Sequence, residues 1–205
     1  MDQVSNGRDY EQQLTHLFNL FNKRFWKNEL PEVIITFVPT RGAHGHVTSV
    51  PVWVSDKDSK YELNISALTI NRSPEDICET ILHEQCHLYN LMHDIKDCSN
   101  MGRYHNVRFK KTAMEHGLNV EHHDRYGWAI TTLNSEAIAY IKRLNLKKFE
   151  FRRATGRAKK HTLMRYACPV CGKDGPFCYV SSHQLIICGT CESAYLEYSP
   201  TEKEQ

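Results

Sequence analysis

Two histidines and a glutamate near the middle of the chain have the types and spacing of a hydrolytic metal site. His83 and His87 are four residues apart in the run His83-Glu84-Gln85-Cys86-His87. On a helix, residues four apart project from one face, one turn apart. A single Zn²⁺ ion at about 2.0–2.1 Å can therefore bind a nitrogen of each ring. Glu84 would then lie beside the first ligand and could take a proton from a zinc-bound water.

A third ligand is needed because catalytic zinc usually has three protein ligands and one open position. His93 follows His87 by six residues, as in a longer histidine motif that has glycine where this chain has Asn90. Asn90 tolerates the left-handed backbone that such a turn requires, so His93 remains a candidate. His105 is the second candidate, at the expected start of another helix, and we favour it.

The group that would stabilise the transition state is not defined by the sequence. The candidates are side chains able to polarise a carbonyl group: Tyr89, Tyr104, His122, His123 and Tyr126. Packed aromatic residues and surface histidines are commoner than catalytic ones, so we assign the role to none of them.

Four cysteines near the C-terminal end have the spacing of a structural zinc site. Cys168 and Cys171 form one close pair, and Cys188 and Cys191 form a second pair 16 residues later. Four thiolates close the tetrahedral shell of zinc and leave no open position. A redox dithiol is the alternative, but two matched pairs favour a metal. The chain should thus hold two zinc ions, one catalytic and one structural, and its ligands favour zinc over manganese.

The surrounding sequence indicates an α+β fold. Apolar residues recur every three or four positions in residues 10–26, which predicts an amphipathic helix. Segments 33–38, 47–54 and 61–65 are rich in β-branched and aromatic residues and predict a small, mostly antiparallel sheet of three strands. Ser73 and Pro74 form a strong helix start, and that helix should carry the metal motif to about Met92.

Shorter elements are expected in the second half of the chain. A helix should follow His105, with Phe109, Ala113 and Leu118 facing inward, and residues 136–144 also have a helical pattern. Short strands are expected around Tyr179 and at residues 185–187.

Basic charge is concentrated in one stretch. Residues 142–165 hold ten Lys or Arg and one acidic residue, whereas the whole chain has a net charge of +2. Phe149 and Phe151 are interleaved with these cations, which suits phosphate contacts and base stacking in sequence-independent, salt-sensitive DNA binding. A solvated linker is the alternative. The expected nucleic-acid contacts are Lys147, Lys148, Arg152, Arg153, Arg157, Lys159 and Lys160.

These features predict three regions. They are a metalloprotease domain at residues 1–145, a basic linker at 146–165 and a four-cysteine zinc ribbon at 166–205. No apolar run has the length of a membrane span or the pattern of a signal peptide, so we expect a cytoplasmic protein without a membrane partner. Association with a nucleoid, or with the nucleus of a eukaryotic cell, would fit the basic stretch.

Over roughly residues 10–195 the chain resembles the SprT-like zinc metalloproteases, which include the Spartan-related DNA–protein crosslink proteases. The likeness rests on a first helix ending near Leu30-Pro31, three short strands, Leu82-His83-Glu84-Gln85-Cys86-His87, a histidine followed four residues later by phenylalanine, and the final zinc ribbon. It implies a minimal zincin-like fold, zinc ligands at His83, His87 and His105, and Glu84 as catalytic base. Asn106 is a departure, since many members have glycine there.

We therefore expect a zinc metalloendopeptidase of the HExxH type that acts on proteins bound or crosslinked to DNA. One alternative is a non-catalytic, zinc-containing accessory or regulatory protein that binds nucleic acid. Glu84 and an open metal position argue against it. The other alternative is a general metalloprotease without a DNA role, which salt-dependent DNA affinity would distinguish.

Overall fold

The fold combines helices with small sheets. The computed structural model describes residues 7–154, 163–172 and 175–197 of the 205-residue chain. The chain divides into two compact units, Met1–Thr155 and Gly156–Gln205. Four helices and several small sheets lie within the described residues, which confirms the predicted α+β class.

All four described helices belong to the first unit. They are α1 (Gly7–Phe25), α2 (Pro74–Met92), α3 (Val107–Glu115) and α4 (Ser135–Arg143). The start of α2 is fixed by a capping box, in which the side chain of Ser73 accepts from the amide of Asp76 and Asp76 accepts from the amide of Ser73. The bounds predicted for this helix are therefore confirmed.

The sheet beside α2 differs in one respect from the expected one. Its strands are β1 (Val33–Thr36), β2 (Gly45–Val47), β3 (Trp53–Val54) and β4 (Ser59–Ile65). β2 and β3 pair with β4 in antiparallel fashion, but β1 runs parallel to β4. The single strand expected at residues 47–54 is two strands, and Pro51 between them has no amide hydrogen to donate to a ladder.

A second sheet was not expected from the sequence. It contains β5 (Cys98–Ser99), β6 (Tyr104–His105), β7 (Leu118–His123) and β8 (Gly127–Leu133), in the order β5-β6-β8-β7. Leu118 belongs to β7 rather than to the preceding helix, although its side chain is buried as predicted.

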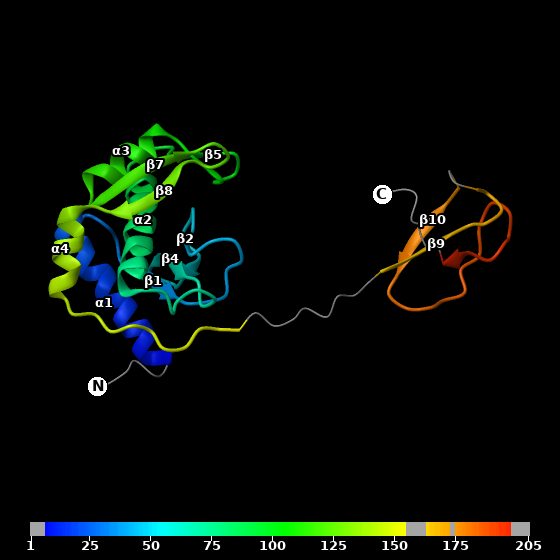
Figure 1. The fold of residues 1–205 in the computed structure, drawn as a ribbon, viewed down its shortest axis with the longest axis horizontal. Coiled ribbons are helices and arrows are strands. Elements are labelled where there is room, and N and C mark those ends of the chain that lie inside the picture. Colours follow the sequence, from blue (N-terminus) through cyan, green and yellow to red (C-terminus); the bar gives the residue numbers. More distant parts are fainter. Residues whose placement is uncertain (1–6, 155–162, 173–174, 198–205) are drawn as a thin grey trace. The chain divides into compact units, whose positions relative to one another are not determined.

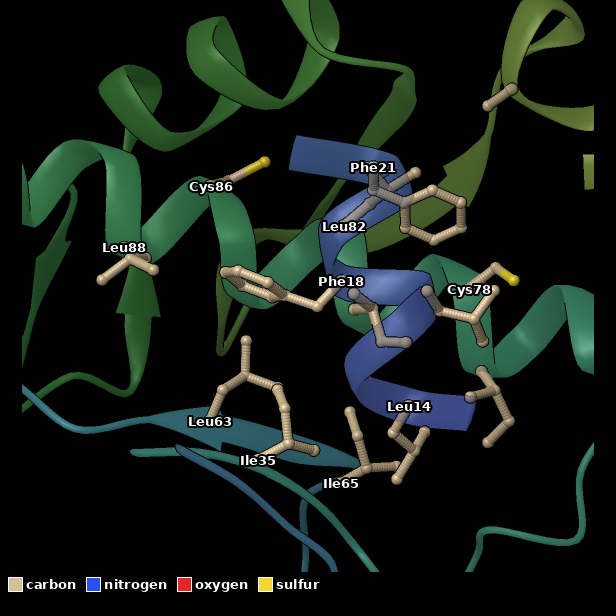
Figure 2. Close-up of a cluster of buried hydrophobic side chains, with 14 of the residues drawn as sticks. Leu14, Phe18, Phe21, Ile35, Leu63, Ile65, Cys78, Leu82, Cys86 and Leu88 are labelled. Atoms are coloured by element: carbon tan, nitrogen blue, oxygen red, sulfur yellow. The ribbon is translucent and has the colours of Figure 1, made fainter. Parts of the chain in front are cut away.

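The helix α2 runs through the middle of the first unit, where it contacts the other three helices and both sheets (Figure 1). On one side, Phe18 and Phe21 of α1 meet Leu82 of α2 and Leu63 of β4 (Figure 2). Each of these side chains is at most 2% exposed. The helix that carries the histidine motif is thus held by apolar packing that involves no metal.

The beginning of the basic stretch is packed on the first unit. Phe149 is 2% exposed, and its ring meets the ring of Tyr10 edge to face at 4.7 Å. The amide of Phe151 donates to the Tyr10 hydroxyl at 2.7 Å, and the amide of Arg153 donates to the carbonyl of Ala67 at 2.8 Å. Phe149 is therefore a core residue, and the expectation that it is available for base stacking is wrong.

The second unit is small. Its described strands are β9 (Met164–Ala167), β10 (Phe177–Val180) and β11 (Leu196–Glu197), and both β10 and β11 pair with β9 in antiparallel fashion. The strand expected around Tyr179 is present, whereas residues 185–187 contribute only an isolated bridge from Ile187 to Ala194. Among the described residues of this unit, the buried ones are Tyr166, Cys168 and Cys188. Apolar burial here is slight.

Candidate metal centre

Three histidine rings converge in the first unit. His83 and His87 extend from the same face of α2, and His105 comes from β6. The Nε2 atoms of His83 and His105 are 3.2 Å apart, those of His83 and His87 are 3.3 Å apart, and those of His87 and His105 are 3.1 Å apart. A tetrahedron with metal–nitrogen bonds of about 2.0–2.1 Å has edges of about 3.3–3.4 Å. The triangle of nitrogens therefore has the size of one face of a zinc site.

The protonation states of two rings also suit a metal. Burial, followed by the charges of the neighbouring histidines, holds the pKa of His83 well below its ordinary value. Burial and the charge of His87 lower the pKa of His105 to about 4. Both rings are neutral at neutral pH, and each has a nitrogen lone pair available for a cation.

The ring of His87 is fixed by a partly buried carboxylate. Its Nδ1 donates to Asp97 at 2.7 Å, and Asn90 donates to the same Asp97 oxygen at 3.0 Å. Thr112 in turn donates to the amide oxygen of Asn90 at 2.7 Å. Burial alone would lower the pKa of His87, but hydrogen bonds to Asp97 and Cys98 outweigh it and raise the pKa to about 10. A carboxylate behind a histidine orients the ring toward a metal.

Phe109 forms an apolar floor beneath the site. Its side chain is fully buried, and its ring centre lies 4.6–4.7 Å from the centres of all three histidine rings. Because Phe109 is on the first turn of α3, the helix that follows His105 closes the back of the site. Asn106 caps this helix by accepting from the amide of Arg108 at 2.8 Å, a role that glycine cannot perform.

Gly127 allows β8 to approach the strand that carries His105. A Cβ atom at Gly127 would lie 2.2 Å from the carbonyl oxygen of His105, and the residue has a φ of +67°. Next to this contact, the amide of His105 donates to the carbonyl of Tyr126 at 2.9 Å. Any larger residue at position 127 would displace the third ring.

Glu84 is buried beside the histidines. It is 7% exposed, and the backbone amide of Val47 in β2 donates to its carboxylate. Burial raises the pKa of Glu84 to about 7, so that the side chain is both a base and an acid near neutral pH. Gly45 lets β2 lie this close, because a Cβ atom there would be 3.3 Å from Cγ of Glu84 and 2.9 Å from the Asn64 carbonyl oxygen.

The site opens into a cleft of about 880 Å³. Its walls are β2 and the residues before it on one side, α2 at the base, and residues 95–98 and 129–131 on the other side. Within the described lining, none of the five candidates for transition-state stabilisation is present. His93 ends α2 and lies against Tyr89, with ring centres 4.2 Å apart, and is not part of the three-histidine group.

The four cysteines of the second unit also converge. The Sγ distances are 3.3 Å for Cys168–Cys191, 3.8 Å for Cys171–Cys188 and 3.6 Å for Cys171–Cys191. These separations exclude disulfides, whose sulfurs are about 2.05 Å apart. They are near the edge of about 3.8 Å that Zn–S bonds of about 2.3 Å produce.

Hydrogen bonds prepare this cluster for a cation. Backbone amides of Thr190 and Cys191 donate to Cys188 and lower its pKa to about 6. Hydrogen bonding to Cys168, Cys191 and Cys188 instead raises the pKa of Cys171 to about 12. Without a metal, the cluster therefore retains a proton that a bound cation would displace.

Four of the predicted nucleic-acid contacts are exposed on the first unit: Lys147, Lys148, Arg152 and Arg153. The other three, Arg157, Lys159 and Lys160, lie outside the described residues. No described helix is both long and apolar enough to cross a bilayer.

Some residues of the site were not found from the sequence. Asp97, Thr131 and the amide of Val47 all reach the histidines or Glu84 from other segments. Their positions depend on the second sheet and on the edge of the first, and no local motif marks them.

Comparison with known proteins supplies one match. The model of a family described as the SprT-like family matches residues 14–130, which is more than half of the chain. The match includes all three converging histidines and Glu84. No curated protein and no solved structure matches the chain.

Proposed function

The chain belongs to the SprT-like family, and on this premise we propose that it is a zinc-dependent metalloendopeptidase with a minimal zincin-like domain. The observation that carries the proposal is the convergence of three histidine Nε2 atoms within 3.1–3.3 Å beside the buried Glu84, at the base of an open cleft. A purely structural site would need neither the base nor the opening.

His83, His87 and His105 would hold the zinc ion through Nε2. When bound, zinc supplies a Lewis acid that acidifies water and polarises the peptide carbonyl group. Asp97 holds the His87 ring in place, and Phe109 excludes water from behind the ligands.

Glu84 would act as the general base and then as the general acid. Its carboxylate would take a proton from the attacking water and deliver that proton to the departing amine. The amide of Val47 holds the carboxylate in one orientation, and burial keeps its pKa near the working pH. The same side chain can therefore accept and release a proton within one reaction cycle.

The substrate would be an extended polypeptide in the cleft. The amide of Thr48 donates to Glu62, and the carbonyl of His44 accepts from Ser66, so these backbone groups of the β2 region face β4. By alternation, the backbone of Gly45 faces away from β4, on the cleft side where β2 is an edge strand. An extended chain could add to that edge through main-chain hydrogen bonds, which do not depend on side-chain identity.

The second unit would hold a structural zinc ion through its four cysteines, and the chain would act on proteins bound or crosslinked to DNA. The exposed cations of residues 147–153 support phosphate contact. On the second unit, Phe177 and Tyr179 are 52% and 58% exposed, and the Arg165 guanidinium lies 4.5 Å from the Phe177 ring centre. Aromatic residues with a neighbouring cation suit base stacking without sequence preference.

The test is cleavage of a DNA-binding protein by the wild type and by Glu84→Gln, each with and without DNA. Glu75→Gln, an exposed carboxylate on the same helix, is the matched control. DNA-dependent cleavage that is lost only in Glu84→Gln supports the whole proposal.

Cleavage that ignores DNA would leave a general metalloprotease and remove the DNA role. Absence of cleavage from protein that holds two zinc ions would favour a non-catalytic accessory protein that binds nucleic acid.

A further inference from the structure

The Nδ1 atoms of the three histidines, which face away from the site, differ in their hydrogen-bond partners. Nδ1 of His87 meets a carboxylate directly. Nδ1 of His83 lies 3.0 Å from the hydroxyl of Thr131, which itself donates to the carboxylate of Glu79. Nδ1 of His105 is buried and has no hydrogen-bond partner among the described residues.

The direction of the hydrogen bonds at Thr131 follows from its single hydroxyl proton. The hydroxyl of Thr131 donates to the carboxylate of Glu79, so its only proton is used in that bond. The oxygen of Thr131 must then accept from His83, so the proton of the neutral His83 ring is on Nδ1. Nε2 of His83 is left with its lone pair, and this is the atom that faces His87 and His105.

Glu79 lies on the face of α2 that carries two of the histidines, with Arg72 and Thr80 nearby. Glu79 precedes His83 by one helical turn, and together with His87 these residues form a stripe on one helix face. Its side chain is partly buried, which is unfavourable for a carboxylate unless hydrogen bonds compensate. Thr131 supplies such a bond from β8, and Thr80 supplies another from α2 itself.

We propose that Glu79 and Thr131 are positioning residues that hold His83 in the tautomer whose Nε2 binds the metal. The inference rests on the proposed function, since it takes the three histidines as metal ligands. Without Glu79, the Thr131 hydroxyl is able to donate to Nδ1, and Nε2 would then carry the proton and lose its lone pair. The hydrogen bonds from His83 to Thr131 and from Thr131 to Glu79 thus orient the His83 ring, as Asp97 orients the His87 ring.

The first test compares Thr131→Val with Thr131→Ser in the full chain. Valine keeps the shape and strand preference of threonine but removes the hydroxyl, whereas serine retains it. Thr132→Val is the matched control, because Thr132 is the next residue of β8 and is exposed. Zinc affinity is measured by competition with a chromophoric chelator, and the four-cysteine site of the same molecule serves as the internal reference.

We expect Thr131→Val to weaken zinc binding at the histidine site about 10–100-fold, the usual effect of losing a partner behind a ligand. Thr131→Ser should stay within about threefold of wild type, and Thr132→Val should equal it. Wild-type affinity in Thr131→Val would overturn the inference. Failure of the wild type itself to bind zinc at the histidines would instead overturn the proposed function.

A second variant, on α2, tests the inference without any change to β8. Glu79→Met keeps the length of the side chain and removes the acceptor. In zinc-free protein, nitrogen NMR of the His83 ring should report a proton on Nδ1 in the wild type and a shift toward Nε2 in Glu79→Met. An unchanged tautomer in a folded Glu79→Met variant would also overturn the inference.

Discussion

The two groups of metal-binding side chains are built in opposite ways. The three histidines are attached to a helix and a strand that a large apolar core already holds in place. The four cysteines lie in a unit whose described residues bury little apart from Tyr166 and two of the cysteines themselves. The core of the first unit positions the histidine site without a metal. In the second unit, a bound metal would supply much of the free energy of folding.

This contrast matches the difference in chemistry. The histidine site faces a cleft and has a buried carboxylate beside it, so a metal ion held there would keep one coordination position accessible to a substrate. The cysteine site offers four sulfurs, which would fill all four positions of a tetrahedral zinc ion. Rigid positioning before metal binding suits catalysis, and metal-dependent folding suits a structural role.

The largest expected effect separates the two units by their need for metal. Cys188→Ser should abolish the fixed structure of the second unit, because metal binding to such sites contributes on the order of 10 kcal/mol of folding free energy. The first unit should keep its structure, since the cluster of buried residues that forms its core includes none of the four metal-site cysteines. Amide NMR spectra of the full chain check this. A second unit that stays ordered in this variant would contradict the claim that its folding depends on the metal.

The next effect concerns catalysis alone. Glu84→Gln should lower the rate of peptide cleavage about 10²–10⁴-fold, the usual contribution of a general base. Its zinc content should stay at the wild-type value, because Glu84 is not one of the converging ligands. Kinetics and metal analysis on the same preparation check both statements. Retained activity would show that another group takes the proton.

Two phenylalanines of the basic stretch test how far the first unit extends. Phe149→Ala should destabilise that unit by about 3–5 kcal/mol, because its buried ring fills part of the core. Phe151→Ala is the control and should change stability by less than about 0.5 kcal/mol, since its side chain is 58% exposed. Denaturant unfolding monitored on the first unit measures the difference. Equal effects would contradict the assignment of Phe149 to the core.

The smallest effect is a dependence of stability on pH in zinc-free protein. Between its ordinary pKa of 4.5 and its folded pKa of about 7, Glu84 is protonated in the folded state and ionised in the unfolded state. The folded state therefore loses stability as pH rises through this window, by about 3 kcal/mol in total. Glu84→Gln removes this loss, so its stability relative to wild type should increase from pH 4 to pH 8. A constant difference would contradict the raised pKa.

Local signals made much of the molecule predictable. Ser73, Pro74 and the acids after them define the start of α2 by hydrogen bonds within a single turn. Residues four apart, such as His83 and His87, lie on one face of any α-helix. The two residues of each cysteine pair are likewise brought together by a local turn. These features need no knowledge of distant segments.

The remaining features depend on contacts between distant segments. The hairpin of β7 and β8 lacks a clean alternation of apolar and polar residues, and Asp97 and Thr131 meet the histidines only because that sheet folds against α2. Phe149 looked like a stacking residue because of its charged neighbours, yet it packs on Tyr10, far away in the sequence. The parallel pairing of β1 with β4 likewise has no local signal.

Counting zinc ions by native mass spectrometry tests the central claim most directly. The wild type should hold two ions. His105→Ala should lose one and should not cleave peptides, while Cys188→Ser should lose the other and keep the first unit folded. A wild type with one ion, or a His105→Ala variant that retains two with unchanged affinity, would contradict the account. That account has an open three-histidine site positioned by the core of the first unit, and a closed four-cysteine site whose metal stabilises the second unit.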